Sequence, residues 1–155
     1  AGSNFAGWSG GTCSGTGSCA FTLNSNTTVN ATFNATSGGR TVTPLTATDI
    51  QGTSGSMLHY SITVPENAKN LVIKISGGTG DADLYVKYGQ TPTTSSYDCR
   101  SYTRGNNETC TFPTPYAGTY HIMIQGGSSF SGLTLSASYQ KPVIDLSPVI
   151  NLLLN

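Results

Sequence analysis

Few side chains of this sequence are placed for acid–base or nucleophilic catalysis. The only two histidines, His59 and His121, fall at outward positions of expected strands and have no acid beside them in sequence. Ser9 lies in a Gly-Trp-Ser-Gly-Gly stretch that matches the G-x-S-x-G elbow of serine hydrolases, but that elbow needs a helix after it, and here a glycine and a cysteine loop follow. We therefore expect no enzyme active site and no required cofactor.

Asp81 and Asp83 are the closely spaced pair among the seven acids, which makes them candidate calcium ligands. Calcium takes roughly six to eight oxygens from carboxylates and backbone carbonyls, and the glycine-rich loop 77–80 lies next to the pair. The same D-x-D spacing fits a structural alternative, in which Asp81 accepts hydrogen bonds from loop amides and Asp83 faces water or pairs with Lys74 or Lys87.

Tyrosines are the stronger candidates for ligand binding, because an exposed tyrosine offers a large amphipathic contact area to sugar rings or protein side chains. Strand alternation directs Tyr85 outward, on the side of His121 and Met123, and directs four others toward a core: Tyr60, Tyr88, Tyr120 and Tyr139. The candidate ligand surface consists of Tyr85, Tyr97, Tyr102, Tyr116 and Arg100. For any one of these tyrosines, packing beneath a long loop is the alternative.

Strands have to position these side chains. Apolar and polar residues alternate with period two in five runs separated by turn residues: 59–64, 70–76, 82–88, 118–124 and 132–139. Two further alternating runs, 19–23 and 27–33, are joined by a hairpin-type connection at 24–26. Because no stretch keeps a helical period, we expect an all-β protein, a jelly-roll-like antiparallel β-sandwich with a small N-terminal β-hairpin segment.

The shortage of charge excludes several classes of partner. Only 9% of the 155 residues are charged and the formal net charge is zero, against roughly 25% charged residues in an average soluble domain. No run of lysine or arginine is present, so we expect no nucleic-acid binding and no polybasic attachment to a membrane. No apolar run approaches the ~20 residues that span a bilayer.

Four cysteines indicate an oxidising compartment. They allow three pairings, among which sequence does not choose. The simplest pairing joins near neighbours, Cys13 with Cys19 and Cys99 with Cys110. The alternative, a zinc site, lacks the C-x₂₋₄-C spacing. Disulfides predict a secreted, extracellular protein.

An ordered set of segments carries a family resemblance over about residues 55–139. The set comprises 80–89 (GDADLYVKYG), 97–102 (YDCRSY), 105–112 (GNNETCTF), 115–120 (PYAGTY) and 130–135 (FSGLTL). In combination it resembles the bacterial pre-peptidase C-terminal domain. The resemblance implies a jelly-roll-like sandwich, a bridge between the cysteines matching Cys99 and Cys110, and a non-catalytic module attached to secreted proteases, chitinases and other hydrolases. Its relatives include collagen-binding modules of clostridial collagenases, and some relatives bind calcium.

A weaker resemblance covers residues 5–33, which look like the closing half of a repeat in bacterial surface and secreted proteins. We therefore expect four regions: a partial β repeat at 1–36, a linker at 37–48, the sandwich at 49–140 and an apolar tail at 141–155. The missing half of the repeat suggests that the chain starts inside a longer polypeptide.

Together these features predict an accessory module of a secreted bacterial hydrolase, either a protease or a polysaccharide-degrading enzyme. It would share a polypeptide with its catalytic domain and bind an insoluble polymer, polysaccharide or collagen-like protein. The alternative is a structural spacer or a maturation or secretion domain, removed on processing and without a ligand.

Overall fold

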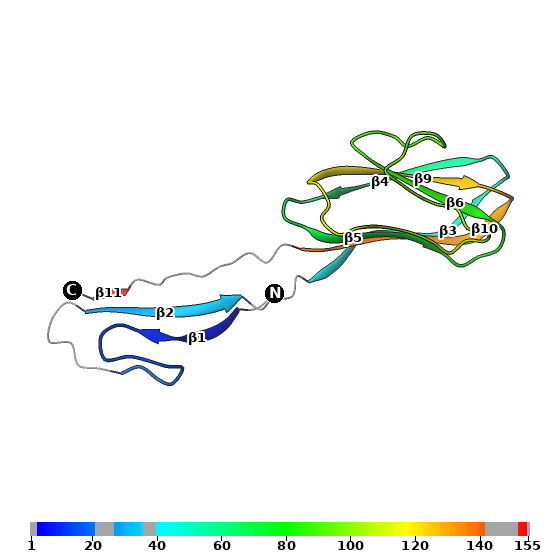
Figure 1. Ribbon diagram of the computed structural model, residues 1–155. Helices are drawn as coiled ribbons and strands as arrows, with labels where there is room; N and C mark the ends of the chain where they lie inside the picture. Colours follow the sequence, from blue (N-terminus) through cyan, green and yellow to red (C-terminus); the bar gives the residue numbers. More distant parts are fainter. Residues whose placement is uncertain (1–2, 21–26, 36–39, 142–151, 155) are drawn as a thin grey trace. The chain divides into compact units, whose positions relative to one another are not determined.

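The structure, a computed structural model, describes residues 3–20, 27–35, 40–141 and 152–154 (Figure 1). The chain divides into two compact units, residues 1–39 with 143–155, and residues 40–142. Antiparallel strands build both units, and the described residues contain no helix long and apolar enough to cross a membrane.

The smaller unit is a three-stranded sheet in the order β1-β2-β11, formed by β1 (Ser3–Ser9), β2 (Thr27–Ala35) and β11 (Leu152–Leu154). Val29 and Ala31 are buried in it, and Phe5 contacts the rings of Trp8 and Phe33. The alternating run 27–33 thus forms a strand as predicted. Of the predicted strand 19–23, the first two residues are outside any strand, and 21–26, with the hairpin connection, lies outside the described residues.

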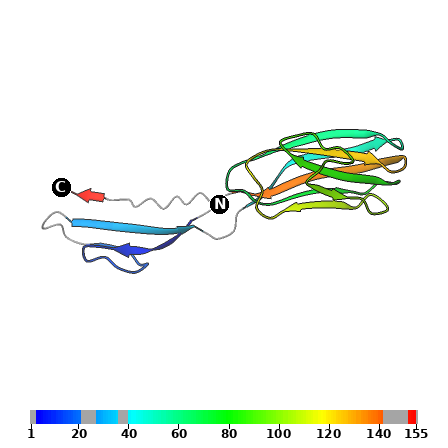
Figure 2. The ribbon, with the colours of Figure 1, turned by 45° about the horizontal axis from the view of Figure 1, so that its top comes forward.

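The larger unit is a sandwich of two four-stranded sheets, as predicted (Figure 1, Figure 2). One sheet has the order β3-β10-β5-β8, with β3 (Thr41–Gly52), β10 (Phe130–Gln140), β5 (Lys69–Ser76) and β8 (Glu108–Phe112). The other has the order β4-β9-β6-β7, with β4 (Met57–Val64), β9 (Gly118–Gly126), β6 (Ala82–Tyr88) and β7 (Cys99–Ser101).

The core lies between these two sheets and follows from the alternation in sequence. Every second residue of a strand points to the same face, so one apolar series per strand fills the space between the sheets. The fully buried members include Leu71, Ile73, Ile75, Leu84, Val86, Ile122, Ile124, Leu133 and Leu135. Both sheets therefore have an outer face on which other side chains can be placed.

The predicted linker at 37–48 differs from the structure over most of its length. Residues 41–48 belong to β3, an edge strand that pairs with β10, and the amide of Lys141 donates to the carbonyl of Arg40 at the end of this pair. Its pairing with β10 has three register shifts, and it contains Pro44, which an edge strand tolerates because one side makes no ladder hydrogen bonds. These irregularities remove the alternation that identifies a strand in sequence.

The predicted tail at 141–155 is described only in part. Leu152–Leu154 form β11, which pairs with β2, while residues 142–151 and 155 lie outside the described residues.

Both local disulfides are present, Cys13–Cys19 in the smaller unit and Cys99–Cys110 in the sandwich. Cys99 opens β7 at the edge of one sheet, and Cys110 lies in β8 at the edge of the other. The second bridge therefore joins the two sheets along one side, and the sulfur of Cys110 is part of the core.

Replacing Cys99 and Cys110 together by serine is expected to lower the free energy of unfolding of the sandwich by about 3 kcal/mol, because the bridge closes a loop of 11 residues in the unfolded chain. Urea unfolding followed by NMR at core amides such as that of Ile124 measures this loss. The matched pair Cys13→Ser and Cys19→Ser lies in the other unit and should leave the sandwich transition unchanged. An equal effect of both pairs would contradict the prediction.

Candidate functional site

The structure brings together four of the five predicted ligand residues. Tyr85, Tyr97, Arg100 and Tyr102 gather on the outer side of the β4-β9-β6-β7 sheet, beside β6 and β7. Arg100 lies opposite Tyr85 in the β6–β7 pair. We call these four residues the tyrosine–arginine face.

Tyr85 corrects one prediction, because it points outward from the sheet and is nevertheless only 5% exposed. The loop 89–98 folds back over this part of the sheet (Figure 1). Its end is fixed by the hydrogen bond from the Asp98 amide to the Val86 carbonyl, and the ring of Tyr97 meets that of Tyr85 edge-on at 5.6 Å. Met123, which faces Tyr85 across the strand pair, is buried beside it. The outer face at these two positions is a small second core beneath a loop.

Arg100 contacts two aromatic rings. Its guanidinium carbon lies 3.7 Å from the centre of the Tyr102 ring and 5.2 Å from that of Tyr97. Such cation–π contacts fix a planar guanidinium while leaving N–H donors at its edge for a ligand. Tyr102 is 60% exposed, and Tyr97 is more than a third exposed. The face accordingly offers two accessible rings and a positioned cation, with Tyr85 as its buried support.

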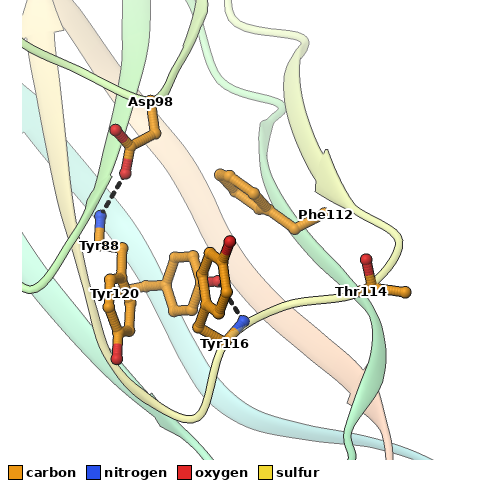
Figure 3. A pocket seen from close by; sticks show the side chains of 6 residues that line it. All are labelled: Tyr88, Asp98, Phe112, Thr114, Tyr116 and Tyr120. Carbon is orange, nitrogen blue, oxygen red and sulfur yellow. Dashed lines mark hydrogen bonds between the residues drawn. The ribbon is translucent and has the colours of Figure 1, made fainter.

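Tyr116, the fifth predicted ligand residue, lies elsewhere. It contacts Tyr88 rather than Tyr85 or Tyr97, with ring centres 5.6 Å apart. It lines a pocket of about 240 Å³ that involves the ends of β6 and β8 and the start of β9 (Figure 3). We call this the tyrosine pocket; it is lined by Tyr88, Asp98, Phe112, Thr114, Tyr116 and Tyr120.

Hydrogen bonds and ring contacts fix the tyrosine pocket. The Tyr88 hydroxyl donates to the Ala117 carbonyl at 2.6 Å, and the Tyr116 amide donates to the Tyr120 hydroxyl at 3.0 Å. The ring of Tyr120 contacts those of Tyr88 and Phe112 at 5.2 and 5.0 Å. Tyr120 is 2% exposed, and burial raises the pKa of its phenol. Tyr116, at 73% exposed, forms the accessible rim.

Sequence reasoning missed most of this pocket. It assigned Tyr88 and Tyr120 to the core, which holds for Tyr120, as it does for Tyr139, whereas Tyr88 is more than a third exposed because β6 ends there. Asp98, Phe112 and Thr114 come from three places that only the fold joins. The exposure of Tyr88 could have been predicted from its position directly before Gly89. An inward side chain at the end of a strand is covered on one side only and remains accessible to solvent on the other.

Asp81 and Asp83 are not grouped around a common point with a third ligand. Asp81 accepts a hydrogen bond from the Gly105 amide at 2.6 Å, as the structural alternative predicts. Within the described ranges, no three or more histidine, cysteine, aspartate or glutamate side chains are placed to hold a metal ion. Calcium binding by Asp81 and Asp83 stays a prediction.

Asp83 lies in a crowded electrostatic environment. Burial raises the pKa of its carboxyl, the charges of Asp81 and Glu108 raise this pKa further, and Arg100 opposes them. Glu108 is itself buried and accepts hydrogen bonds from the hydroxyls of Ser101 and Thr103. The ionised form of Asp83 is therefore less favourable in the folded state than in the unfolded state. At neutral pH its charge lowers the stability of the fold.

Replacing Asp83 by asparagine is expected to raise the melting temperature at pH 7. A carboxyl whose pKa is raised on folding favours the folded state below its unfolded pKa, and this contribution disappears as the pH rises through the folded pKa. The difference from the parent should therefore shrink on acidification and vanish below about pH 3.9, the ordinary value for aspartate. Glu66→Gln, at an exposed turn, is the control. A variant less stable at pH 7 would contradict the expectation.

Comparison with known proteins bears on the sandwich. Residues 58–126 match the family model of the bacterial pre-peptidase C-terminal domain. The chain is 49% identical over 89 residues to the neutral protease of Vibrio proteolyticus, covering 57% of this chain and 14% of that protein. It is 46% identical over 97 residues to an extracellular protease of Xanthomonas campestris, covering 63% of this chain and 16% of that protein.

A solved structure gives the same result. The solution structure titled vEP C-ter 100 matches with a TM-score of 0.51 and 48% identity, covering 59% of this chain and 90% of that chain. The chain thus spans about one sixth or less of the two curated relatives, and most of the chain in this solved structure. It belongs to the bacterial pre-peptidase C-terminal domain family, the accessory and non-catalytic domain of secreted proteases.

Proposed function

We propose that the sandwich is an accessory domain that keeps a secreted protease on an insoluble protein substrate, through the tyrosine–arginine face. The observation that carries this proposal is the pair of cation–π contacts that Arg100 makes with Tyr102 and Tyr97 on an accessible surface. Aromatic and arginine side chains dominate the binding energy of protein interfaces, because they combine large contact area with directed hydrogen bonds.

The shape of this face supports contact with an extended surface. Its exposed rings lie on the outer side of a sheet, whereas a small-molecule site is a concave pocket. The buried ring of Tyr85 fixes Tyr97 from below, so the face is organised before a ligand arrives and less entropy is lost on binding.

The names of the relatives favour a protein rather than a polysaccharide as the insoluble polymer that the domain binds. The two curated relatives described above are named as proteases, one of them as extracellular. A domain in the same polypeptide as a protease increases the local concentration of the catalytic domain at a solid substrate, which is an effect of tethering. Secretion of this chain is part of the proposal and agrees with its two disulfides.

Replacing Tyr102 by alanine is expected to weaken binding to insoluble protein at least about fivefold, since truncating a central aromatic costs more than about 1 kcal/mol. Cosedimentation of the full chain with fibrillar collagen, elastin, chitin and cellulose measures this. Met57→Ala removes another exposed apolar side chain, which lies in the same sheet and outside the face, and serves as the control.

Two results would overturn the proposal: no cosedimentation with any protein fibre, or binding that Tyr102→Ala leaves unchanged. Retention on chitin or cellulose alone would assign the face to polysaccharide. A spacer or maturation domain predicts a different pattern in a protease carrying this chain. Deleting the domain would then reduce activity equally on soluble and insoluble substrates, whereas targeting predicts a selective loss on the insoluble one.

A further inference from the structure

We propose that the tyrosine pocket binds the cationic side chain of a lysine or arginine from a protein. The pocket is separate from the tyrosine–arginine face in its residues, and only the identification of the ligand's source as a substrate protein rests on the proposed function. Its aromatic walls and a single carboxylate carry the inference (Figure 3).

The pocket offers one charged acceptor to a ligand, the carboxylate of Asp98. Of its hydroxyls, that of Tyr88 donates to the Ala117 carbonyl, and that of Tyr120 accepts from the Tyr116 amide. Asp98 accepts from the Tyr88 amide through one oxygen, Oδ2, at 2.8 Å. No side chain or amide of the described residues donates to its second oxygen, Oδ1.

Charge favours a cation in this environment. Within the part of the chain that the structure describes, no lysine, arginine or histidine forms an ion pair with Asp98. The faces of Tyr88, Tyr116 and Tyr120 carry the negative side of their ring quadrupoles, which attract a cation and repel an anion. Lysine and arginine heads are cationic donors and thus match the Oδ1 oxygen of Asp98.

Size and polarity point to one side chain rather than a sugar chain. The volume of about 240 Å³ is below the roughly 300–1,000 Å³ of sites for drug-sized ligands. An aliphatic stem between aromatic rings with its charged head at the exposed Asp98 is the arrangement that lysine and arginine adopt at interfaces between apolar surface and water.

The experiment is an NMR titration of the ¹⁵N-labelled full chain with blocked lysine and arginine amides. Blocked norleucine amide, which has a similar stem without the charge, and blocked glutamate amide are the matched ligands. We expect saturable shifts at the amides of Tyr88, Tyr116 and Ala117 with lysine or arginine. Norleucine should bind about two- to fivefold more weakly, and glutamate should not shift these amides.

Variants separate the pocket from its surroundings. Asp98→Asn keeps an oxygen for the Tyr88 amide and removes the charge, so we expect about two- to fivefold weaker binding of lysine and arginine and unchanged binding of norleucine. Tyr116→Ala, at the exposed rim, should weaken all three about twofold or more. Met57→Ala, which changes an exposed apolar side chain outside both the pocket and the tyrosine–arginine face, should change none of them.

Equal affinity for norleucine and lysine, or indifference of lysine binding to Asp98→Asn, would overturn the inference, as would the absence of shifts at the three pocket amides. These results are independent of the cosedimentation experiment. Cosedimentation with protein fibres without lysine binding would support the proposed function and reject a cationic ligand for the pocket. Lysine binding without cosedimentation would support the cationic ligand and reject the proposed function.

Discussion

The bridge between Cys99 and Cys110 is the constraint on which both candidate surfaces depend. It joins an edge strand of one sheet to an edge strand of the other, so the segment between the two cysteines is held at both ends. Arg100 and Tyr102 lie in this segment, directly after Cys99. Phe112, which lines the tyrosine pocket, follows Cys110 at the end of β8. A covalent tie therefore limits the motion of these two edge strands and of the loop between them, which carries Tyr102.

Polar contacts hold the middle of this segment, between the two cysteines. The carboxylate of Asp81 accepts from the Gly105 amide, and the side-chain amide of the buried Asn106 donates to the Gly77 carbonyl. Buried Glu108 accepts from two hydroxyls of the same segment. Because buried polar groups are costly unless paired, these contacts select one conformation of the loop. Asp81, one of the two acids that sequence alone offered as calcium ligands, thus has an observed role in organising the chain.

The sequence determined the sandwich more fully than the site. Runs such as that of Leu71, Ile73 and Ile75 repeat with period two, and each forms a strand that fills the core. The edge strand β3 was missed because Pro44 and register shifts break its alternation. Tyr85 was assigned correctly to the outer side and wrongly to solvent, since nothing periodic indicates that loop 89–98 covers it. Tyr97 and Tyr102 were found because they lie outside the alternating runs, and Arg100 because it follows Cys99. The pocket instead joins residues that only the folded sheets bring together.

The pairing of β3 with β10 has a mechanical consequence. Arg40 and Lys141 are adjacent at one end of this antiparallel pair, so the sandwich is entered and left by the chain at the same corner. Tension between these two residues acts across the ladder and loads its hydrogen bonds one after another, beginning with the bond from Lys141 to Arg40. The two strands would therefore separate from that end first. A force applied at the tyrosine–arginine face would instead reach the other sheet through the Cys99–Cys110 bond. The proposed binding surface and the two chain ends of the sandwich thus differ in how they resist force.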